Sequence, residues 1–309
     1  MATQETRLQA LIRGPKQTFK KNPLAYLFVL PTIVYLIFLW WIPFLWGVRM
    51  SFFRWPLFGE PTYIGLENYI GLVTWDVFYI SLKATLIYGL QTIPQMIIGV
   101  GAALLIWNQK RFVGLASLAF LAPYIFPPLI IGTLWAFLLQ PDLGPIFDYL
   151  TRFGVLGQPI YWSVNGDTAL AIITLVGTWT FWPLVFLLVI SSLRGIPSSH
   201  IEAAKVYGAN RWQRFRHVIL PEIKTAILIA LILRIIWNLG KIEQPLQITR
   251  GGPGWQTSVL GILIYRLAWL RDQLGMAFAG GLILAVISLL FVSGFIYMFE
   301  RSSGEVKME

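Results

Sequence analysis

One segment of the chain combines side chains that could bind a hydroxyl-rich solute. The segment from Leu233 to Lys241 reads LRIIWNLGK and also contains Arg234, Trp237 and Asn238. The four polar or aromatic residues are spaced i, i+3, i+4 and i+7, so on a helix they share one face. An aromatic ring can pack on the C–H surface of a sugar, and an amide can hydrogen-bond to its hydroxyl groups. The spacing therefore predicts a binding face for such a solute.

Arg234 lies within an otherwise apolar run. A charged group in the middle of a bilayer costs at least about 2.5–3.5 kcal/mol, so it normally has a partner or faces water. No acidic residue lies within any of the six long apolar runs. Its partner is predicted to be Glu243 or another loop acid, a group on a second subunit, or the solute. A structural role and a role in a solute path are both open.

A polar, basic island at 199–222 separates two apolar runs. Ser199 and Glu202 are predicted to form a capping box that begins a helix. Gly208 is predicted to end that helix in the left-handed conformation, and Asn210 to cap a second short helix. Pro221 suits the first turn of a following helix, where no N–H donor is needed. The pattern predicts a helix–glycine–helix elbow outside the bilayer.

The composition indicates a polytopic membrane protein. The 309 residues are 57% hydrophobic and only 12% charged, whereas soluble domains carry about 25% charged residues. The net charge of +10 does not indicate nucleic-acid binding, because the basic residues lie in turns between apolar runs and form no stripe with aromatic residues. The chain has no cysteine, and both of its histidines, His200 and His217, lie in the elbow, so we expect no metal site.

Six apolar runs are long enough to cross about 30 Å of hydrocarbon. We expect a cytoplasmic segment at 1–22, containing a short surface helix, a transmembrane domain at 23–300 with its loop at 195–222, and a cytoplasmic tail at 301–309. The recurrence of proline within the runs favours a solute path over a plain anchor. The six predicted spans are 24–48, 84–108, 112–140, 168–193, 225–242 and 276–299.

The distribution of lysine and arginine predicts the orientation. If the N-terminus is inside, the inner segments hold fifteen of these residues and the outer segments hold eight. The positive-inside rule therefore places both termini and the elbow in the cytoplasm.

Three motifs carry a resemblance to a known family. The elbow contains Glu202-Ala203-Ala204, Gly208 and Ile219-Leu220-Pro221, which resembles the EAA loop of permease subunits in ATP-binding-cassette (ABC) importers. The sequences GLENY at 65–69 and TRGGP at 249–253 resemble turns of the sugar-permease branch, the maltose-permease-like family. Together the motifs cover nearly the whole chain. Tyr207 departs from the pattern, because that branch commonly has aspartate there.

The resemblance implies an all-α, type I ABC importer permease fold with six transmembrane helices and a cytoplasmic coupling helix. It implies a prokaryotic inner membrane protein, embedded in lipid, that works by alternating access with a second homologous permease, two ATPase subunits and an extracytoplasmic solute-binding protein. Because the chain lacks a G-x-x-x-x-G-K-[ST] loop, we expect it not to be an enzyme, with ATP and magnesium bound by the partner subunits. The implied coupling residues are Glu202, Ala203, Ala204 and Gly208.

The resemblance also implies substrate contacts on three spans. Those on the third span match Tyr124 and, less closely, Pro128. Those on the fourth span match Thr180, Phe181 and Leu184, and those on the fifth match Trp237 and Asn238. Arg234 and Lys241 join this set from the helix-face argument above. Pro128 and Leu184 carry no hydroxyl group, so a polar contact is not expected from their side chains.

Two alternatives remain open. Arg234 and Lys241 would also suit glycerol phosphate or another anionic solute. A secondary transporter independent of ATP is the alternative from a different class. It predicts acidic residues within spans and inverted repeats, and the sequence shows neither.

Overall fold

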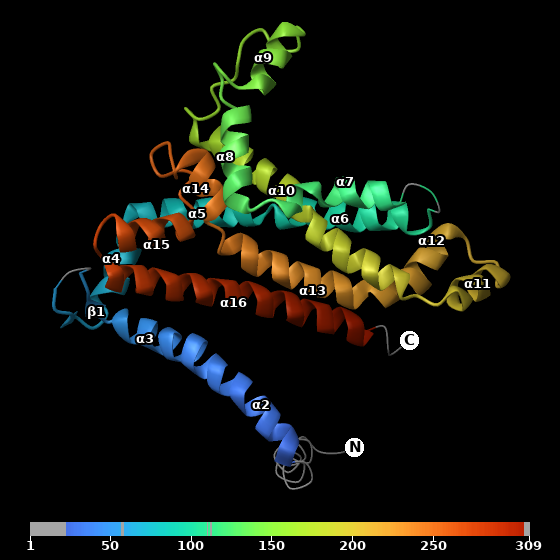
Figure 1. The fold of residues 1–309 in the computed structure, drawn as a ribbon, viewed down its shortest axis with the longest axis horizontal. Coiled ribbons are helices and arrows are strands. Elements are labelled where there is room, and N and C mark those ends of the chain that lie inside the picture. The colour runs from blue at the N-terminus through green and yellow to red at the C-terminus, as the bar shows by residue number, and fades with distance from the viewer. Residues whose placement is uncertain (1–22, 57–58, 110, 112, 306–309) are drawn as a thin grey trace.

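The chain folds into long helices joined by short loops (Figure 1). The computed structural model describes residues 23–56, 59–109, 111 and 113–305, so the predicted surface helix within 1–22 lies outside the described residues. The elements of the first half are α2 Pro23–Leu36, η1 Ile37–Trp41, α3 Ile42–Met50, β1 Phe53–Arg54, β2 Thr62–Tyr63, α4 Glu67–Val73, α5 Asp76–Gly89, α6 Thr92–Trp107, α7 Val113–Ile125, α8 Pro128–Leu138 and α9 Pro145–Arg152. Those of the second half are α10 Gly166–Arg194, α11 Ser198–Val206, α12 Arg211–Arg214, η2 Phe215–Ile219, α13 Leu220–Leu239, α14 Glu243–Thr249, α15 Leu260–Trp269 and α16 Leu274–Glu305.

Among the described residues, four helices are long and apolar enough to cross a membrane. They are Leu27–Met50, Asp76–Trp107, Gly166–Arg194 and Leu274–Phe299. They correspond to the predicted first, second, fourth and sixth spans, although the second begins at Asp76 and not at residue 84.

The third predicted span is not one straight helix. α7 and α8 are bent by 91° relative to each other across a short break, and the pair counts as a fifth span only if it is taken as one unit. Pro127 and Pro128 explain the bend, since a residue that precedes proline is pushed out of the helical region. Pro127 indeed has a ψ of 138°.

The predicted fifth span corresponds to α13. Its 20 residues make a helix about 30 Å long. It carries Glu222, Lys224 and Arg234. It is therefore more charged than the four helices above and is not one of them. Nevertheless, its interior positions Ala230, Arg234, Ile235 and Asn238 are buried against other helices.

α10 forms the centre of the bundle and packs most extensively against α6. A Cβ on Gly99 of α6 would lie only 2.5 Å from Val185 Cβ and 3.0 Å from Phe186 N, so glycine is what allows the close approach. Gly101 faces open space within 4 Å. Gly99 therefore marks a close contact between the two helices, and Gly101 does not.

The first span stands apart from the bundle. The most apolar 18 residues of Leu27–Met50 are not buried at all. Figure 1 shows α2 and α3 diverging from the other long helices. Only its end at Gly47–Ser51 is packed, next to α16 and α4. A helix that is apolar all round must be covered by lipid or by another protein.

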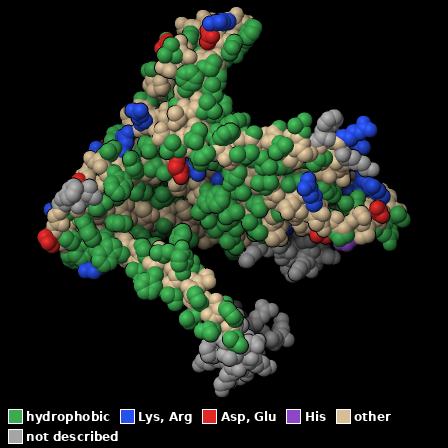
Figure 2. Space-filling view, viewed as in Figure 1, with side chains coloured by type: hydrophobic (Ala, Val, Ile, Leu, Met, Phe, Trp, Pro, Cys, Tyr) green, Lys and Arg blue, Asp and Glu red, His purple; other side chains and the backbone are tan. Residues whose placement is uncertain are grey.

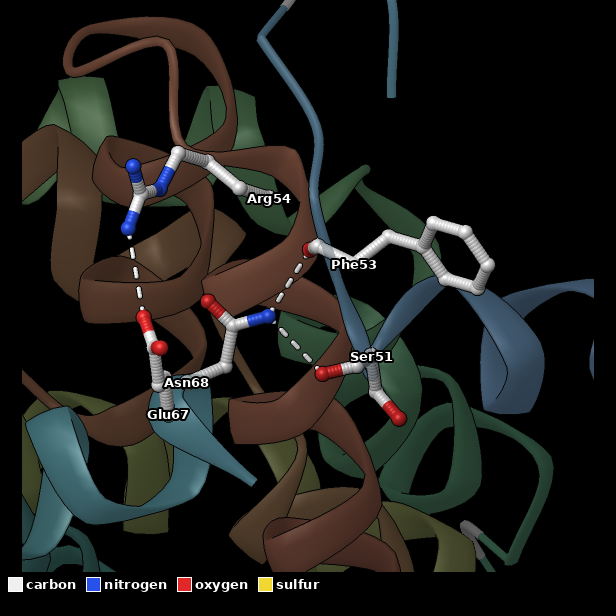
Figure 3. Close-up of polar contacts among 5 residues, drawn as sticks. All are labelled: Ser51, Phe53, Arg54, Glu67 and Asn68. Carbon is white, nitrogen blue, oxygen red and sulfur yellow. Dashed lines mark hydrogen bonds and ion pairs between the residues drawn. The ribbon is translucent and has the colours of Figure 1, made fainter. Parts of the chain in front are cut away.

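The GLENY motif fastens that end (Figure 3). Asn68 donates through Nδ2 to the carbonyl oxygens of Ser51 at 2.8 Å and Phe53 at 2.9 Å. Arg54 forms an ion pair with Glu67 at 3.2 Å. Asn68 thus satisfies backbone acceptors where the helix ends and the β1–β2 pair begins, which gives the motif a structural purpose.

The TRGGP motif closes the turn after α14. Arg250 and Gly251 both have positive φ, at 52° and 83°, and the Gly252–Pro253 peptide bond is cis. Thr257 donates through Oγ1 to the Gly252 carbonyl oxygen at 2.6 Å, and Arg266 donates to the carbonyl oxygen of Arg250. These contacts tie the turn to the start of α15.

Candidate functional site

The end of α7, the middle of α10 and the last turns of α13 enclose a cavity of about 590 Å³. Its size lies within the range of about 300–1,000 Å³ that is usual for small-molecule sites. The bend at Pro127–Pro128 contributes because it turns the chain from Tyr124 to Pro128 toward α10 and α13. In Figure 2 the visible face is mostly hydrophobic, with a few charged side chains in its middle.

Phe181 lies close to both cations of the cavity wall, Arg234 and Lys241. Lys241 Nζ is 4.5 Å from the centroid of its ring, and Arg234 Cζ is 5.2 Å from the same ring. Arg234 Cζ also lies 5.5 Å from the Trp237 ring. Cations over aromatic faces gain about 0.5–2 kcal/mol, and more when they are desolvated. The wall therefore presents aromatic surface together with positive charge.

Arg234 is held by a backbone group. Its side chain is fully buried, and it donates through Nη1 to the Phe181 carbonyl oxygen at 2.9 Å. Its Nε has no hydrogen-bond partner. No ion pair found among the described residues involves Arg234, and Glu243 pairs with Lys241 at 3.6 Å. Of the alternatives predicted for the partner of Arg234, Glu243 is therefore wrong, because its carboxylate pairs with Lys241.

The structure brings most of the predicted substrate residues together. Six of the eight predicted positions line the cavity, namely Tyr124, Thr180, Phe181, Arg234, Trp237 and Lys241, and so does Pro128. Leu184 and Asn238 do not line it. Asn238 is 1% exposed and donates through Nδ2 to Thr92 Oγ1 at 2.8 Å and to Gln95 Oε1 at 2.9 Å.

Asn238 does not reach the cavity because of helix geometry. It lies one residue past Trp237, which is about 100° further around α13, and this turns its amide toward α6. The shared face predicted for the four polar residues is thus divided. Arg234, Trp237 and Lys241 lie at the cavity, and Asn238 belongs to a buried hydrogen-bond network behind it.

Two residues at the site were not among the predicted substrate contacts. Glu243 lines the cavity. Gln244 lies behind it, fully buried, donating through Nε2 to Thr180 Oγ1 at 2.8 Å and accepting from the Tyr88 hydroxyl at 3.2 Å. Gln244 thereby fixes the orientation of a cavity residue. In the sequence, Gln244 could have been noticed from its position next to Glu243, directly after the segment that supplies Lys241.

The second predicted site is the elbow of α11, α12 and η2. α11 begins at Ser198 after Pro197, with no side-chain cap. The predicted Ser199–Glu202 capping box is therefore wrong, because Pro197 occupies the cap position and Ser199 lies within the first turn. Asn210 does cap α12, in a full capping box with Gln213.

Gly208 ends α11 as predicted. Its φ is +76°, and the amides of Gly208 and Ala209 donate to the carbonyl oxygens of Lys205 at 3.0 Å and Ala204 at 2.9 Å. This is the Schellman pattern, which satisfies the last carbonyls of a helix. Val206 and Tyr207 at the bend are 86% and 90% exposed.

The predicted coupling residues share this exposed tip. Glu202, Ala203 and Gly208 are exposed, and Ala204 is half-buried. The opposite side of the elbow packs through Ile201 and Ile219 against the core of α6 and α10. The elbow thus has a packed side, at Ile201 and Ile219, and an exposed tip of about two helical turns.

Comparison with known families matches residues 95–302 to the binding-protein-dependent transport system inner membrane component family. This is more than half of the chain, and the chain belongs to that family.

Two curated relatives and one solved structure agree with this assignment. The chain is 31% identical over 297 residues to the probable starch degradation products transport system permease protein AmyD of Thermoanaerobacterium thermosulfurigenes, covering 94% of this chain and 99% of the relative. It is 27% identical over 278 residues to the sn-glycerol-3-phosphate transport system permease protein UgpA of Agrobacterium fabrum, covering 87% and 92%.

The solved structure is a chain of a bacterial alginate ABC transporter, in complex with an alginate pentasaccharide-bound periplasmic protein. The TM-score is 0.78 at 23% identity, with 92% of this chain and 96% of that chain covered. The likeness confirms the predicted permease fold.

Proposed function

We propose that this chain is the permease subunit that forms half of the translocation pathway for a sugar or polyol in an ABC importer. The observation that carries the proposal is the cavity, which gathers Tyr124, Thr180, Phe181 and Trp237 from three separate helices. Hydroxyl groups and aromatic faces on one wall suit a polyhydroxylated solute. The names of AmyD and of the alginate transporter, which refer to saccharides, support the same solute class.

The energy is supplied by separate subunits. Two ATPase subunits bind ATP and magnesium, and this chain neither binds nor hydrolyses the nucleotide. The exposed tip of the elbow docks into an ATPase, where Glu202 pairs with an arginine and Ala203 permits close approach. Both termini and the elbow lie in the cytoplasm. An extracytoplasmic binding protein delivers the solute at the other end of the bundle.

A second, homologous permease completes the pathway. Two observations support this. The cavity is built by one set of helices only, and the apolar surface of α2 and α3 lies uncovered by the rest of this chain.

Site-directed crosslinking tests the coupling proposal directly. Because the chain has no cysteine, Ala203→Cys introduces a single thiol at the exposed elbow. In the assembled transporter we expect it to crosslink to an ATPase subunit, with the yield changing between nucleotide-free and ATP-bound states. Val155→Cys, at a position that is 66% exposed in the loop between α9 and α10, is the control and should not crosslink. Absence of a crosslink at 203 would contradict the proposal, as would uptake that survives vanadate but is abolished by an uncoupler.

A second candidate substrate is an anionic solute such as glycerol phosphate. It is favoured by two cations, Arg234 and Lys241, facing one acid, Glu243, at the cavity, and by the name of UgpA. Lys241→Gln decides between the two solutes. A neutral sugar substrate predicts uptake within about twofold of the unmodified transporter, because a partly exposed charge contributes little. An anionic substrate predicts a fall of about tenfold or more, as for a charged hydrogen bond.

A further inference from the structure

A second pocket of about 530 Å³ lies beside the elbow, apart from the solute cavity. It is enclosed by the end of α6 and the residues that follow, by one face of α11, and by α12 with η2. Of the residues that the structure describes, three cations line it, namely Lys205, Arg211 and Arg214, and no acidic residue does. Figure 2 shows Lys and Arg side chains gathered at this end of the molecule.

No ion pair within the described part of the chain neutralises the charge of the pocket. The ion pairs among the described residues involve none of Lys205, Arg211 and Arg214. Arg211 and Arg214 are three positions apart at the start of a continuous helical segment, so they project toward the same side. Three converging cations without an acid form a site for an anion with several acceptor oxygens.

Part of the remaining lining is apolar and lies at the edge of a span, beside the amide side chains of Asn108 and Gln109. Trp107 is the last residue of α6, and Ile201 and Ile219 complete the apolar part of the pocket. Tryptophan is enriched where a span meets the membrane surface. The pocket therefore suits a ligand with a charged end and an apolar end.

An apolar stripe on α6 leads from the membrane to the pocket. Ile98 and Leu105, seven residues apart on one helix face, are 41% and 72% exposed. Gln109, which lines the pocket, donates through Nε2 to the Leu105 carbonyl oxygen at 3.4 Å. An acyl chain could lie along this stripe while its headgroup occupies the pocket.

The pocket uses the side of α11 that the coupling tip does not. Ile201 and Lys205 are one turn apart and line the pocket. At 3.6 residues per turn, Ala203 and Val206 point roughly the opposite way, and Val206 is 86% exposed. An ATPase docked on the tip would leave the pocket open to another ligand.

We propose that the pocket of Lys205, Arg211 and Arg214 binds the phosphate of an anionic phospholipid headgroup, and that the bound lipid fastens the elbow to the end of α6. Basic pockets between helices at the cytoplasmic surface are a recurring way to bind such headgroups. The bound lipid would hold α11 and α12 at a fixed distance from the span and so make the elbow a stiffer lever.

The test measures lipid retention by the assembled transporter, with its ATPase subunits, by native mass spectrometry. Short-chain phosphatidylglycerol is the probe, and phosphatidylcholine and inorganic phosphate are compared with it. We expect phosphatidylglycerol to bind, phosphatidylcholine not to, and inorganic phosphate to compete only weakly because it lacks the apolar end. Equal binding of phosphatidylcholine would overturn the proposal. Full competition by inorganic phosphate would also overturn it, and would identify a site for a free anion.

The variant Arg211→Gln/Arg214→Gln should bind the probe about 25-fold more weakly, at roughly fivefold for each removed charge. Arg194→Gln/Arg216→Gln is the matched control, since both of its arginines are exposed and lie outside the pocket. Arg211→Lys/Arg214→Lys should restore most of the binding. An equal loss in the control would assign the effect to general surface charge and overturn the proposal.

A second measurement needs no variant. Hydrogen exchange of residues 201–219 is compared in nanodiscs of phosphatidylglycerol and of phosphatidylcholine. We expect slower exchange with phosphatidylglycerol, and no difference would contradict the proposal. If the assembled transporter retains no lipid, these cations are free to contact the ATPase instead, which also overturns it. Neither readout requires transport, so failure here leaves the proposed function standing.

Discussion

The cavity between α7, α10 and α13 and the elbow of α11 and α12 differ in how their polar groups are held. In the elbow, Asn210 and Gln213 cap each other across three positions, and the amides of Gly208 and Ala209 bond to carbonyls three and five residues earlier. In the cavity wall, Arg234 bonds to Phe181 across 53 positions, and behind it Asn238 bonds to Thr92 across 146.

This difference bears on movement. The elbow can shift as a unit because its hydrogen bonds are local and travel with it. The cavity changes shape only when whole helices move relative to one another, since its contacts join α6, α10 and α13. Under the proposed function, a push on the elbow would reach the cavity through the packing of Ile201 and Ile219 against α6 and α10. Coupling elements that stay intact while they move are suited to transmit a displacement.

The largest effect is expected at Arg234. If Arg234 binds the solute, we expect uptake to fall about 10–100-fold in Arg234→Met, because a charged hydrogen bond to the solute is worth about 1.5–3 kcal/mol. The amount and thermal stability of the transporter should change little, since an apolar residue of similar volume often replaces a buried charge without loss. Arg49→Met is the control, because Arg49 stacks on Trp46 and Phe53 outside the cavity. Subunit amounts that fall in parallel with uptake would show that Arg234 is structural.

The next largest effect is expected at Gly99, where α6 packs closely against α10. We expect Gly99→Ala to lower the free energy of unfolding by about 1–3 kcal/mol, because its Cβ would collide with Val185 and overpacking is destabilising. Gly101→Ala, on the same helix but facing open space, should change stability by less than about 0.5 kcal/mol. Thermal unfolding in detergent measures both. Equal shifts would mean that α6 and α10 do not meet as closely as the structure shows.

Gly208 tests the elbow. Gly208→Val places a branched residue at φ +76°, at a cost of about 1–2 kcal/mol, and should reduce uptake and binding-protein-stimulated ATP hydrolysis by about tenfold. Gly154→Val carries the same strain at φ +69° with equally open surroundings, in the loop between α9 and α10. If both variants lose the same activity, strain alone is responsible and the elbow has no special role.

The smallest effect is expected from the helix caps. Asn210→Ala and Asn165→Ala each remove a side chain that caps a helix, α12 and α10 respectively, and each should destabilise its helix end by about 1 kcal/mol. Hydrogen exchange should show similar local fraying in both. Only Asn210→Ala should also slow uptake, by about twofold to fivefold. A matching slowdown in Asn165→Ala would remove the distinction between the two regions.

Local features were predictable from the sequence to the extent that they depend on nearby residues. The Gly208 end and the Asn210 cap were predicted correctly, because each depends on the conformational preferences of one or two residues. α13 begins at Leu220, next to Pro221 as predicted, but it continues from η2 without a break. The predicted Ser199–Glu202 capping box was wrong, although it also involves only nearby residues. The helix begins at Ser198, with Pro197 in the cap position.

The sequence by itself also determined the membrane class, the family motifs and most of the residues at the cavity. Apolar content and span length are properties of the chain, and they depend on no contact. Only the tertiary structure decided that Phe181 and not an acid holds Arg234, that Asn238 faces α6, and that Gln244 supports Thr180. Those outcomes depend on which helix lies beside which, and on a rotation of about 100° per residue that no spacing can fix until the neighbouring helices are in place.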